Sequence, residues 1–265
     1  MNFNLIRDPA DERDFRLGSI LGRPKIRRKL DWSRLMSPVK DQGTLGSCAA
    51  FATVAMKEYE EFRERQKPNI PNVYDFSEQW VYYMAKKIDD WPDQEGTSLK
   101  YTMKVLKDIG VPTEEAWPYN DAEIGEPLEW ASMVAKWYVI DSYWRVQGLR
   151  EILAALDKSG PFPIGIEVFS NIYSTTGDGI IPYPNPTSKS EGGHAVCLVG
   201  YNNKRELLKF KNSWSLEWGL DGYGFISYKY ARDFLWDAWV AKDFIEVTGP
   251  TEKMQRIIEE NRGNA

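Results

Sequence analysis

Histidine, cysteine and long apolar runs are all scarce in this chain. His194 is the only histidine among 265 residues, so imidazole chemistry near neutral pH has a single candidate. This scarcity excludes a histidine-rich metal site. A structural zinc site would need carboxylate ligands beside the two cysteines, which matches the usual ligand sets poorly. We therefore expect no metal and no cofactor.

Positive charge is also in short supply. The net charge is −5 and the pI is about 5.2, so the chain lacks a broad basic surface for phosphates, and we expect no nucleic-acid partner. No apolar run approaches the roughly 18 residues that cross a bilayer, and we expect no membrane partner. The first residues lack the pattern of a secretory signal, and Cys48 and Cys197 provide no disulfide framework. These absences predict a cytoplasmic protein of undetermined oligomeric state.

The first half of the chain has the pattern of a helical unit. Hydrophobic residues make up 42% of the chain and aromatic residues 14%, which is typical of a globular fold. Residues 1–29 are charged and rich in Pro and Gly, which predicts an extended arm. Apolar residues at 3–4 spacing predict helices over 47–67, 79–87 and 99–108. The outer face of the first helix is predicted to carry Glu60, Glu61, Glu64 and Arg65.

From about residue 129 the pattern changes to that of a sheet. After a short helix over 149–158, branched and aromatic residues predict strands over 162–168, 195–201, 206–211 and 223–227. Residues 177–193 have the composition of a long loop, and 248–265 that of a short polar helical tail. A helical lobe (30–128) followed by a sheet lobe (129–247) predicts an α+β fold with a cleft between the lobes.

Cys48 is a candidate nucleophile. It lies at the predicted start of the first helix, where unpaired N–H groups and the helix dipole favour a thiolate and lower the pKa of a thiol. On position alone, a small buried cysteine at a helix start accounts for it equally well. Cys197 lies in the apolar strand Ala-Val-Cys-Leu-Val, where core packing is the better interpretation.

Asn212 is the candidate third member of a catalytic set with Cys48 and His194. An imidazole that acts on a thiol needs a third group to orient it. Together, the segments Gln42-Gly-Thr-Leu-Gly-Ser-Cys48, Gly193-His194-Ala195 and Asn212-Ser-Trp214 resemble those of the papain family of cysteine peptidases. His194 follows Cys48 by 146 residues, within the roughly 130–150 of that family. Further likeness lies in Phe76-Ser-Glu-Gln and Trp117-Pro-Tyr, and it covers residues 30–247.

The resemblance implies a two-lobed fold with a barrel-like sheet lobe, and a role for each matching residue. Cys48 would be the nucleophile, His194 its acid–base partner and Asn212 the group that orients His194. Gln42 would donate to the oxyanion beside the Cys48 N–H. The residues expected to bind a peptide or polypeptide substrate are Gly96, Thr97, Gly165, Gly193, Ala195, Trp214 and Trp218. Trp214 would also shield the His194 pair, and Trp218 would line the leaving-group side.

The chain departs from the family pattern at several positions. Leu45 replaces a disulfide cysteine and Ala49 replaces the tryptophan after the nucleophile. Glu95-Gly96-Thr97 replaces the family's Asn-Gly-Gly, and Ser215 replaces a glycine. A long inhibitory pro-region is missing from the sequence. We expect residues 1–29 to occlude part of the cleft and to be cleaved near 23–29.

The leading hypothesis is a cysteine endopeptidase that acts through an acyl-enzyme. Transfer of the acyl group to an amine, in a transpeptidase or ligase, would need the same residues. A catalytically silent peptide-binding homologue is the third hypothesis, although such proteins usually lose one of the residues retained here. Small residues at Gly165 and Ala195 suggest a roomy pocket for the second residue before the scissile bond. Asp233 and Asp237 are interpreted as solvated surface carboxylates.

Overall fold

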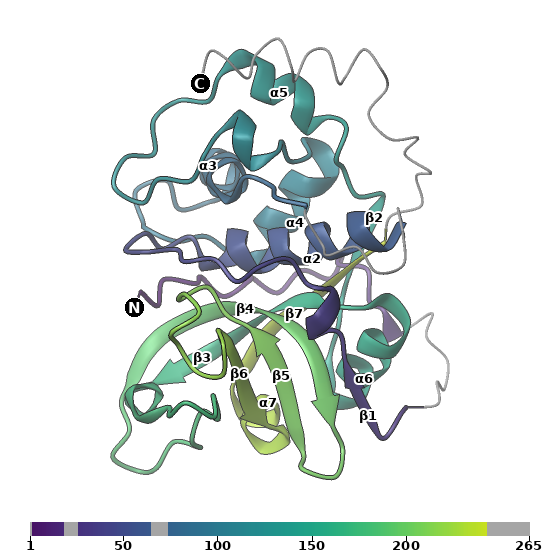
Figure 1. Ribbon diagram of the computed structural model, residues 1–265, viewed down its shortest axis with the longest axis vertical. Coiled ribbons are helices and arrows are strands. Elements are labelled where there is room, and N and C mark those ends of the chain that lie inside the picture. Colours follow the sequence, from purple (N-terminus) through teal and green to yellow (C-terminus); the bar gives the residue numbers. More distant parts are fainter. Residues whose placement is uncertain (1, 19–25, 65–73, 243–265) are drawn as a thin grey trace.

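The helical lobe is built around one central helix. The computed structural model describes residues 2–18, 26–64 and 74–242, so the predicted tail over 248–265 lies outside the described residues. The central helix, α2, runs from Cys48 to Glu64 and lies between the other helices and the sheet (Figure 1). The other helices of this lobe are α3 (Glu78–Ile88), α4 (Leu99–Asp108), η2 (Glu114–Ala116) and α5 (Glu129–Ala135). The helix predicted over 99–108 is confirmed at both ends.

The second lobe is an antiparallel sheet of seven strands. Its strands are β1 (Lys29–Asp31), β2 (Ser142–Arg145), β3 (Phe162–Phe169), β4 (Ser190–Asn202), β5 (Leu207–Lys211), β6 (Tyr223–Ser227) and β7 (Leu235–Lys242). The order is β2-β7-β3-β4-β5-β6, with β1 paired to β4, and the sheet is not closed. The connections contain η1 (Ser33–Leu35), α6 (Gly148–Ser159), η3 (Ser170–Ser174) and α7 (Tyr228–Phe234). The α+β fold class is therefore confirmed, although the loop predicted over 177–193 ends in the first residues of β4.

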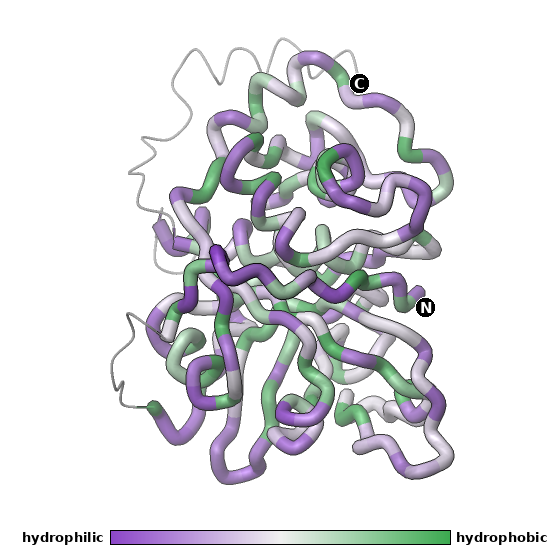
Figure 2. Tube along the Cα trace, turned by 180° about the vertical axis from the view of Figure 1, so that it is seen from behind, coloured by the Kyte–Doolittle hydropathy of each residue, from purple (hydrophilic) through white to green (hydrophobic). Residues whose placement is uncertain are grey.

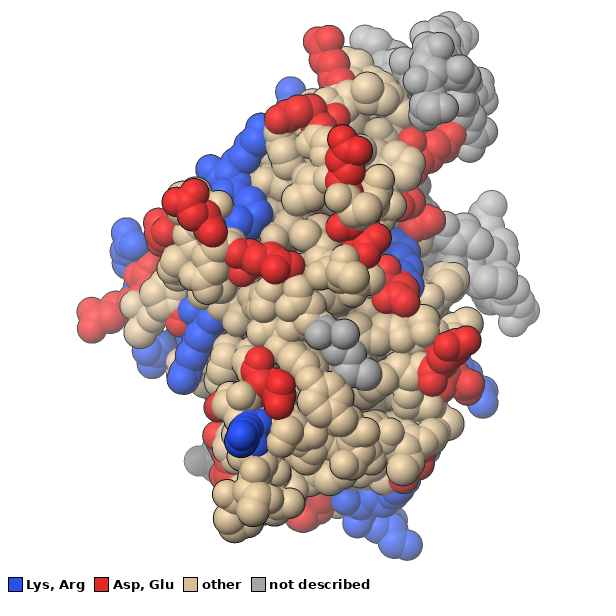
Figure 3. Space-filling view, turned by 90° about the vertical axis from the view of Figure 1, so that its left-hand side faces the viewer, with Lys and Arg blue, Asp and Glu red and all other residues tan. Residues whose placement is uncertain are grey.

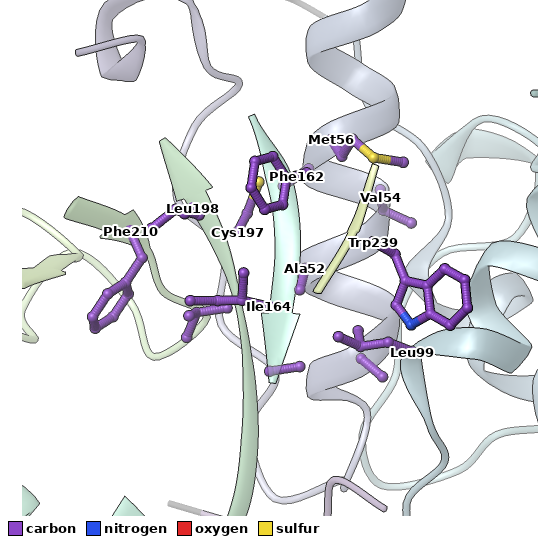
Figure 4. Close-up of a cluster of buried hydrophobic side chains, with 14 of the residues drawn as sticks. Ala52, Val54, Met56, Leu99, Phe162, Ile164, Cys197, Leu198, Phe210 and Trp239 are labelled. Carbon is purple, nitrogen blue, oxygen red and sulfur yellow. The ribbon is translucent and has the colours of Figure 1, made fainter. Parts of the chain in front are cut away.

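The core lies where α2 meets the sheet. Ala52, Val54 and Met56 of the helix point toward a cluster that includes Ile164 of β3 and Trp239 of β7 (Figure 4). Fourteen of the 17 residues of α2 are buried, which is more than an amphipathic surface helix would bury. Removing this much apolar surface from water is the main favourable contribution to folding. The core thus fixes α2, and Cys48 at its first residue, against the sheet.

The charged side of α2 is only in part the outer face that was predicted. Glu64 is exposed as predicted, whereas Glu60 and Glu61 are buried and Arg65 lies outside the described residues. Lys57 Nζ lies 2.8 Å from Glu61 Oε1, and both side chains are fully buried. The same ammonium donates a 2.8 Å hydrogen bond to the carbonyl of Val139. Partners from the segment before β2 therefore allow charged side chains to be covered, which the spacing within the helix could not reveal.

The N-terminal arm runs between the two lobes. Residues 2–18 form the extended segment that separates the helices above from the sheet below in Figure 1. The N–H of Leu5 donates to the carbonyl of Gly193 in the sheet lobe at 3.0 Å, and the N–H of Ile6 donates to the carbonyl of Thr97 in the helical lobe at 3.1 Å. On the face at the N-terminal end of the arm, acidic side chains gather over the helical half of the surface (Figure 3). Residues 2–18 of the predicted arm are therefore part of the folded structure.

Within the described parts of the chain, no helix has the length and apolar character needed to cross a membrane. Hydrophobic stretches are short and alternate with hydrophilic ones along the chain (Figure 2).

Candidate active site

Cys48 is the first residue of α2 and is fully buried. Its sulfur accepts hydrogen bonds from backbone N–H groups, including that of Ala195, the residue after His194. Burial raises the pKa of the Cys48 thiol to about 11, and the N–H donors lower it by less. The sequence predicted a lowered pKa at this helix start. That expectation is wrong for the arm-docked form, because the loss of hydration outweighs the helix terminus.

His194 is held by Asn212 across two neighbouring strands. The His194 Nε2 and Asn212 Oδ1 atoms are 2.8 Å apart, and both side chains are buried. The amide oxygen can only accept, so Nε2 carries the proton and Nδ1 is left as the basic nitrogen. Among the described residues Nδ1 has no hydrogen-bond partner. Burial lowers the pKa of His194 to about 4, and the Asn212 hydrogen bond opposes this shift.

Trp214 covers this pair. Its ring stacks on the His194 imidazole with the centroids 4.3 Å apart and the planes at 18°. Trp218 meets Trp214 edge-on at 5.2 Å, and both indoles are at least nine-tenths buried. The two tryptophans thus form an apolar wall that keeps water from the histidine–asparagine hydrogen bond.

Gln42 lies beside Cys48 in the loop that precedes α2. Its side chain is fully buried; Oε1 accepts from the Ser213 hydroxyl at 2.6 Å, and Nε2 donates to the Leu45 carbonyl at 2.9 Å. The amide is therefore fixed with one N–H still available. The four residues predicted to be catalytic are thus brought to one place, where the start of α2 meets β4 and the end of β5.

The residues predicted to bind substrate line the path of the arm. In the sheet, Gly165 is paired with Ala195, and Leu5 of the arm lies over Gly165. A Cβ at Gly165 would stand 2.7 Å from the Leu5 side chain, and one at Gly193 would stand 2.6 Å from the Leu5 carbonyl. A Cβ at Gly193 would also stand 2.1 Å from the Trp236 ring, so the arm and this tryptophan together require glycine there. Leu5 is only 5% exposed.

Gly96 and Thr97 lie on the opposite side of the arm. The carbonyl of Thr97 accepts from Ile6, whereas the N–H of Gly96 donates to the Tyr82 hydroxyl at 3.2 Å and its carbonyl accepts from Lys86 at 3.0 Å. Gly96 thus makes no backbone pair with the arm. A Cβ at Gly96 would nevertheless overlap the arm, 1.8 Å from the Asn4 carbonyl oxygen.

A buried polar cluster, which the sequence did not indicate, anchors the arm to both lobes. Asp8 accepts from the backbone N–H of Lys100 at 3.0 Å and from the Trp239 indole at 2.6 Å, and its own N–H donates to Asp237 at 2.9 Å. Arg145 lies between the two carboxylates, 3.3 Å from Asp8 and 3.1 Å from Asp237. We call these five residues the arm latch. Asp8 is one acidic residue in a segment for which no helix or strand was predicted, so the sequence did not indicate these partners.

The two predicted surface carboxylates have different environments. Asp237 is 3% exposed, so its interpretation as a solvated residue is wrong: β7 turns it toward the arm. Asp233 is exposed and pairs with Lys229 at 2.7 Å, as expected of a surface group. Cys197 is buried in β4, and burial raises the pKa of its thiol to about 12. The described residues contain no group of three or more His, Cys, Asp or Glu that could hold a metal ion.

Known proteins share both this sequence and this fold. The model of the family described as papain family cysteine protease matches residues 26–234. A peptidase C1-like protein of Acanthamoeba polyphaga mimivirus is 29% identical over 284 residues, covering 94% of this chain and 88% of that protein. Mouse procathepsin L is 28% identical over 210 residues, which cover 75% of this chain and 60% of that protein.

Among solved structures, xylellain, a cysteine protease from Xylella fastidiosa, superposes with a TM-score of 0.82 at 29% identity. The match covers 92% of this chain and 97% of xylellain. Family model, relatives and fold agree with the site described above. The chain therefore belongs to the papain family of cysteine proteases and is a peptidase, a hydrolase of peptide bonds.

Proposed function

We propose that this peptidase is an endopeptidase that forms an acyl-enzyme on Cys48, and that its own N-terminal arm partly inhibits it. The observation that carries the catalytic assignment is the 2.8 Å contact between His194 and Asn212 beside the first residue of α2. It leaves one imidazole nitrogen free in the neighbourhood of the only cysteine that lies at a helix start.

The chemistry follows from the proton positions. His194 Nδ1 takes the thiol proton, and the Cys48 thiolate attacks the carbonyl carbon of the scissile bond. The negative charge that develops on the carbonyl oxygen is met by the free N–H of Gln42 and by the N–H of Cys48. His194 then returns its proton to the leaving amine. Water, activated by the same imidazole, releases the acyl group and restores the thiol.

The path of the arm supports action within a chain. Phe3 lies edge-on to Trp214, with the centroids 5.7 Å apart, whereas Leu5 covers Gly165 and Asp8 reaches Asp237. An extended polypeptide is therefore accommodated on both sides of the catalytic pair. A continuous path of this kind favours an endopeptidase over an enzyme that trims chain ends.

The chain direction of the arm is opposite to the direction expected of a cleavable substrate. By the family resemblance, a substrate passes from the pocket at Gly165 toward the leaving-group side at Trp218. The arm passes from Phe3, near the tryptophans, to Leu5 at Gly165. Its peptide bonds are thus presented backwards. With the arm docked, Cys48 and His194 are both buried, and burial favours the neutral forms of both groups.

Two cysteine variants test the catalytic assignment. We expect Cys48→Ala to lose peptide hydrolysis and covalent labelling by E-64, because the nucleophile is gone. Cys197→Ala removes the other thiol, which lies in β4, and we expect it to retain both activities. Hydrolysis or labelling that survives in Cys48→Ala would overturn the proposal. Mass spectrometry of products formed with added amines separates hydrolysis from acyl transfer.

The predicted cleavage site of the arm lies partly outside the described residues, which resume at residue 26. Equal activity of the chain with and without the arm would argue against the inhibitory role.

A further inference from the structure

Tyr119, in the segment Trp117-Pro-Tyr, reaches the active-site loop from the helical lobe. Its ring packs edge-on against Phe51 of α2, with the centroids 4.9 Å apart and the planes at 85°. Its backbone N–H donates to Glu114 at 2.6 Å. Ring and backbone are thus fixed independently of the hydroxyl, which is directed at residues 42–47.

The Tyr119 hydroxyl joins the two ends of that loop. It donates to the backbone carbonyl of Gln42 at 2.8 Å and lies 2.6 Å from the Ser47 hydroxyl. A phenol has one proton, and it is donated to the Gln42 carbonyl, so the Ser47 hydroxyl is the donor in the second contact. One oxygen atom therefore links the residue that supplies the side-chain oxyanion donor to the residue that precedes the nucleophile.

Hydrogen bonds take the place of the covalent tie that the family pattern implies at this loop. Leu45 replaces the disulfide cysteine. The loop is held instead by side chains of the helical lobe: Glu95 accepts from the N–H of Gly46 at 2.7 Å, and Asp121 accepts from the N–H of Thr44 at 2.8 Å. These two contacts hold the middle of the loop, whereas the Tyr119 hydroxyl contacts both of its ends.

We propose that Tyr119 is a positioning residue of the oxyanion hole. Ser213 orients the Gln42 amide, and the Tyr119 hydroxyl fixes the Gln42 backbone relative to the N–H of Cys48. Both oxyanion donors are thereby held at the spacing that the tetrahedral intermediate requires. The inference rests on the proposed function, since it assigns a role in the same reaction.

The test uses Tyr119→Phe in the full chain, which keeps the ring on Phe51 and removes only the hydroxyl. We expect kcat/KM to fall about tenfold, mainly in kcat, which is less than the 10²–10³-fold cost of deleting an oxyanion donor. Inhibition by a peptide aldehyde should weaken by a similar factor, because its hemithioacetal oxygen occupies the same site. Reaction of Cys48 with a dipyridyl disulfide should stay within about twofold, because no oxyanion forms.

Dividing kcat/KM by the rate of the dipyridyl disulfide reaction makes the test independent of the arm, since both reactions need the same access to Cys48. Tyr228→Phe is the matched control: this buried tyrosine donates a 2.7 Å hydrogen bond to Asn203 in the sheet lobe. We expect the control to lose stability without changing the ratio. If Tyr119→Phe fails to fold, Ser47→Ala removes the second contact and should lower turnover in the same selective way.

A parallel fall of turnover and disulfide reaction, or no fall in either, would overturn the positioning role. The proposed function fails separately, if the wild-type chain shows no turnover that depends on Cys48.

Discussion

The arm side chain over Gly165 provides a measure of how firmly the cleft is closed. Leu5 is 5% exposed, and it occupies the space above a glycine that forms part of the sheet. Truncating a buried leucine to alanine removes its transfer free energy and leaves a cavity, at a cost of about 2–5 kcal/mol in protein cores. Because the arm is a peripheral segment that can settle into the space, we expect Leu5→Ala to weaken docking by about 2–3 kcal/mol.

This weakening converts into a rate. Cys48 is fully buried while the arm is docked, so we expect a thiol reagent to reach it only after the arm opens. When opening and reclosing are fast relative to labelling, the labelling rate follows the opening equilibrium. A loss of about 2–3 kcal/mol therefore predicts an increase of about 30- to 160-fold in the labelling rate of the full chain.

The assay is labelling by a dipyridyl disulfide at fixed pH, with the modified cysteine identified by mass spectrometry. The Cys197→Ala background removes the second thiol. Leu128→Ala is the control, because this leucine is 45% exposed, at the start of α5, and its truncation leaves no cavity under the arm. If Leu5→Ala labels at the rate of the control, Leu5 does not hold the arm in place and the reasoning is refuted.

Two further predictions concern buried charges. Burial, and then the neighbouring Asp8, raise the pKa of Asp237 to about 7; the docked arm therefore favours the protonated form, so docking is strongest at low pH and weakens as the pH rises through about 7. The labelling rate of Cys48 in the wild type, divided by that in Asp237→Asn, should rise across this range, and a ratio independent of pH would contradict the linkage. Lys57→Met should lower the free energy of unfolding by about 3–5 kcal/mol in urea titrations, because it breaks the buried ion pair between Lys57 and Glu61; a change below about 1 kcal/mol would contradict this.

Local pattern and chemistry were enough to predict most of the site. The helix over 99–108 shows its periodicity within ten residues, and Cys48, His194 and Asn212 lie in three short segments that together resemble the papain family. The α+β fold, the papain family and the peptidase activity follow from the same segments. These features share one property: each depends on short segments and on the order and spacing of those segments along the chain.

What could not be predicted depends on partners far away in the chain. Strand β7 was not predicted, and Asp237 within it is buried against an arm residue more than 200 positions away. Glu61 looks solvent-facing by helical spacing, yet its lysine partner is covered by a carbonyl from the segment before β2. Such burial depends on tertiary packing, which no window of sequence contains.

The arm latch also has a consequence for the order in which the chain folds. Asp8 and Asp237 are 229 positions apart, so the arm can complete its contacts only after β7 has been made. Contacts of such long sequence separation form late, because loop closure must precede them. Full closure of the cleft is therefore among the last steps of folding, and a nascent chain that stops before β7 would carry the nucleophile without its complete restraint.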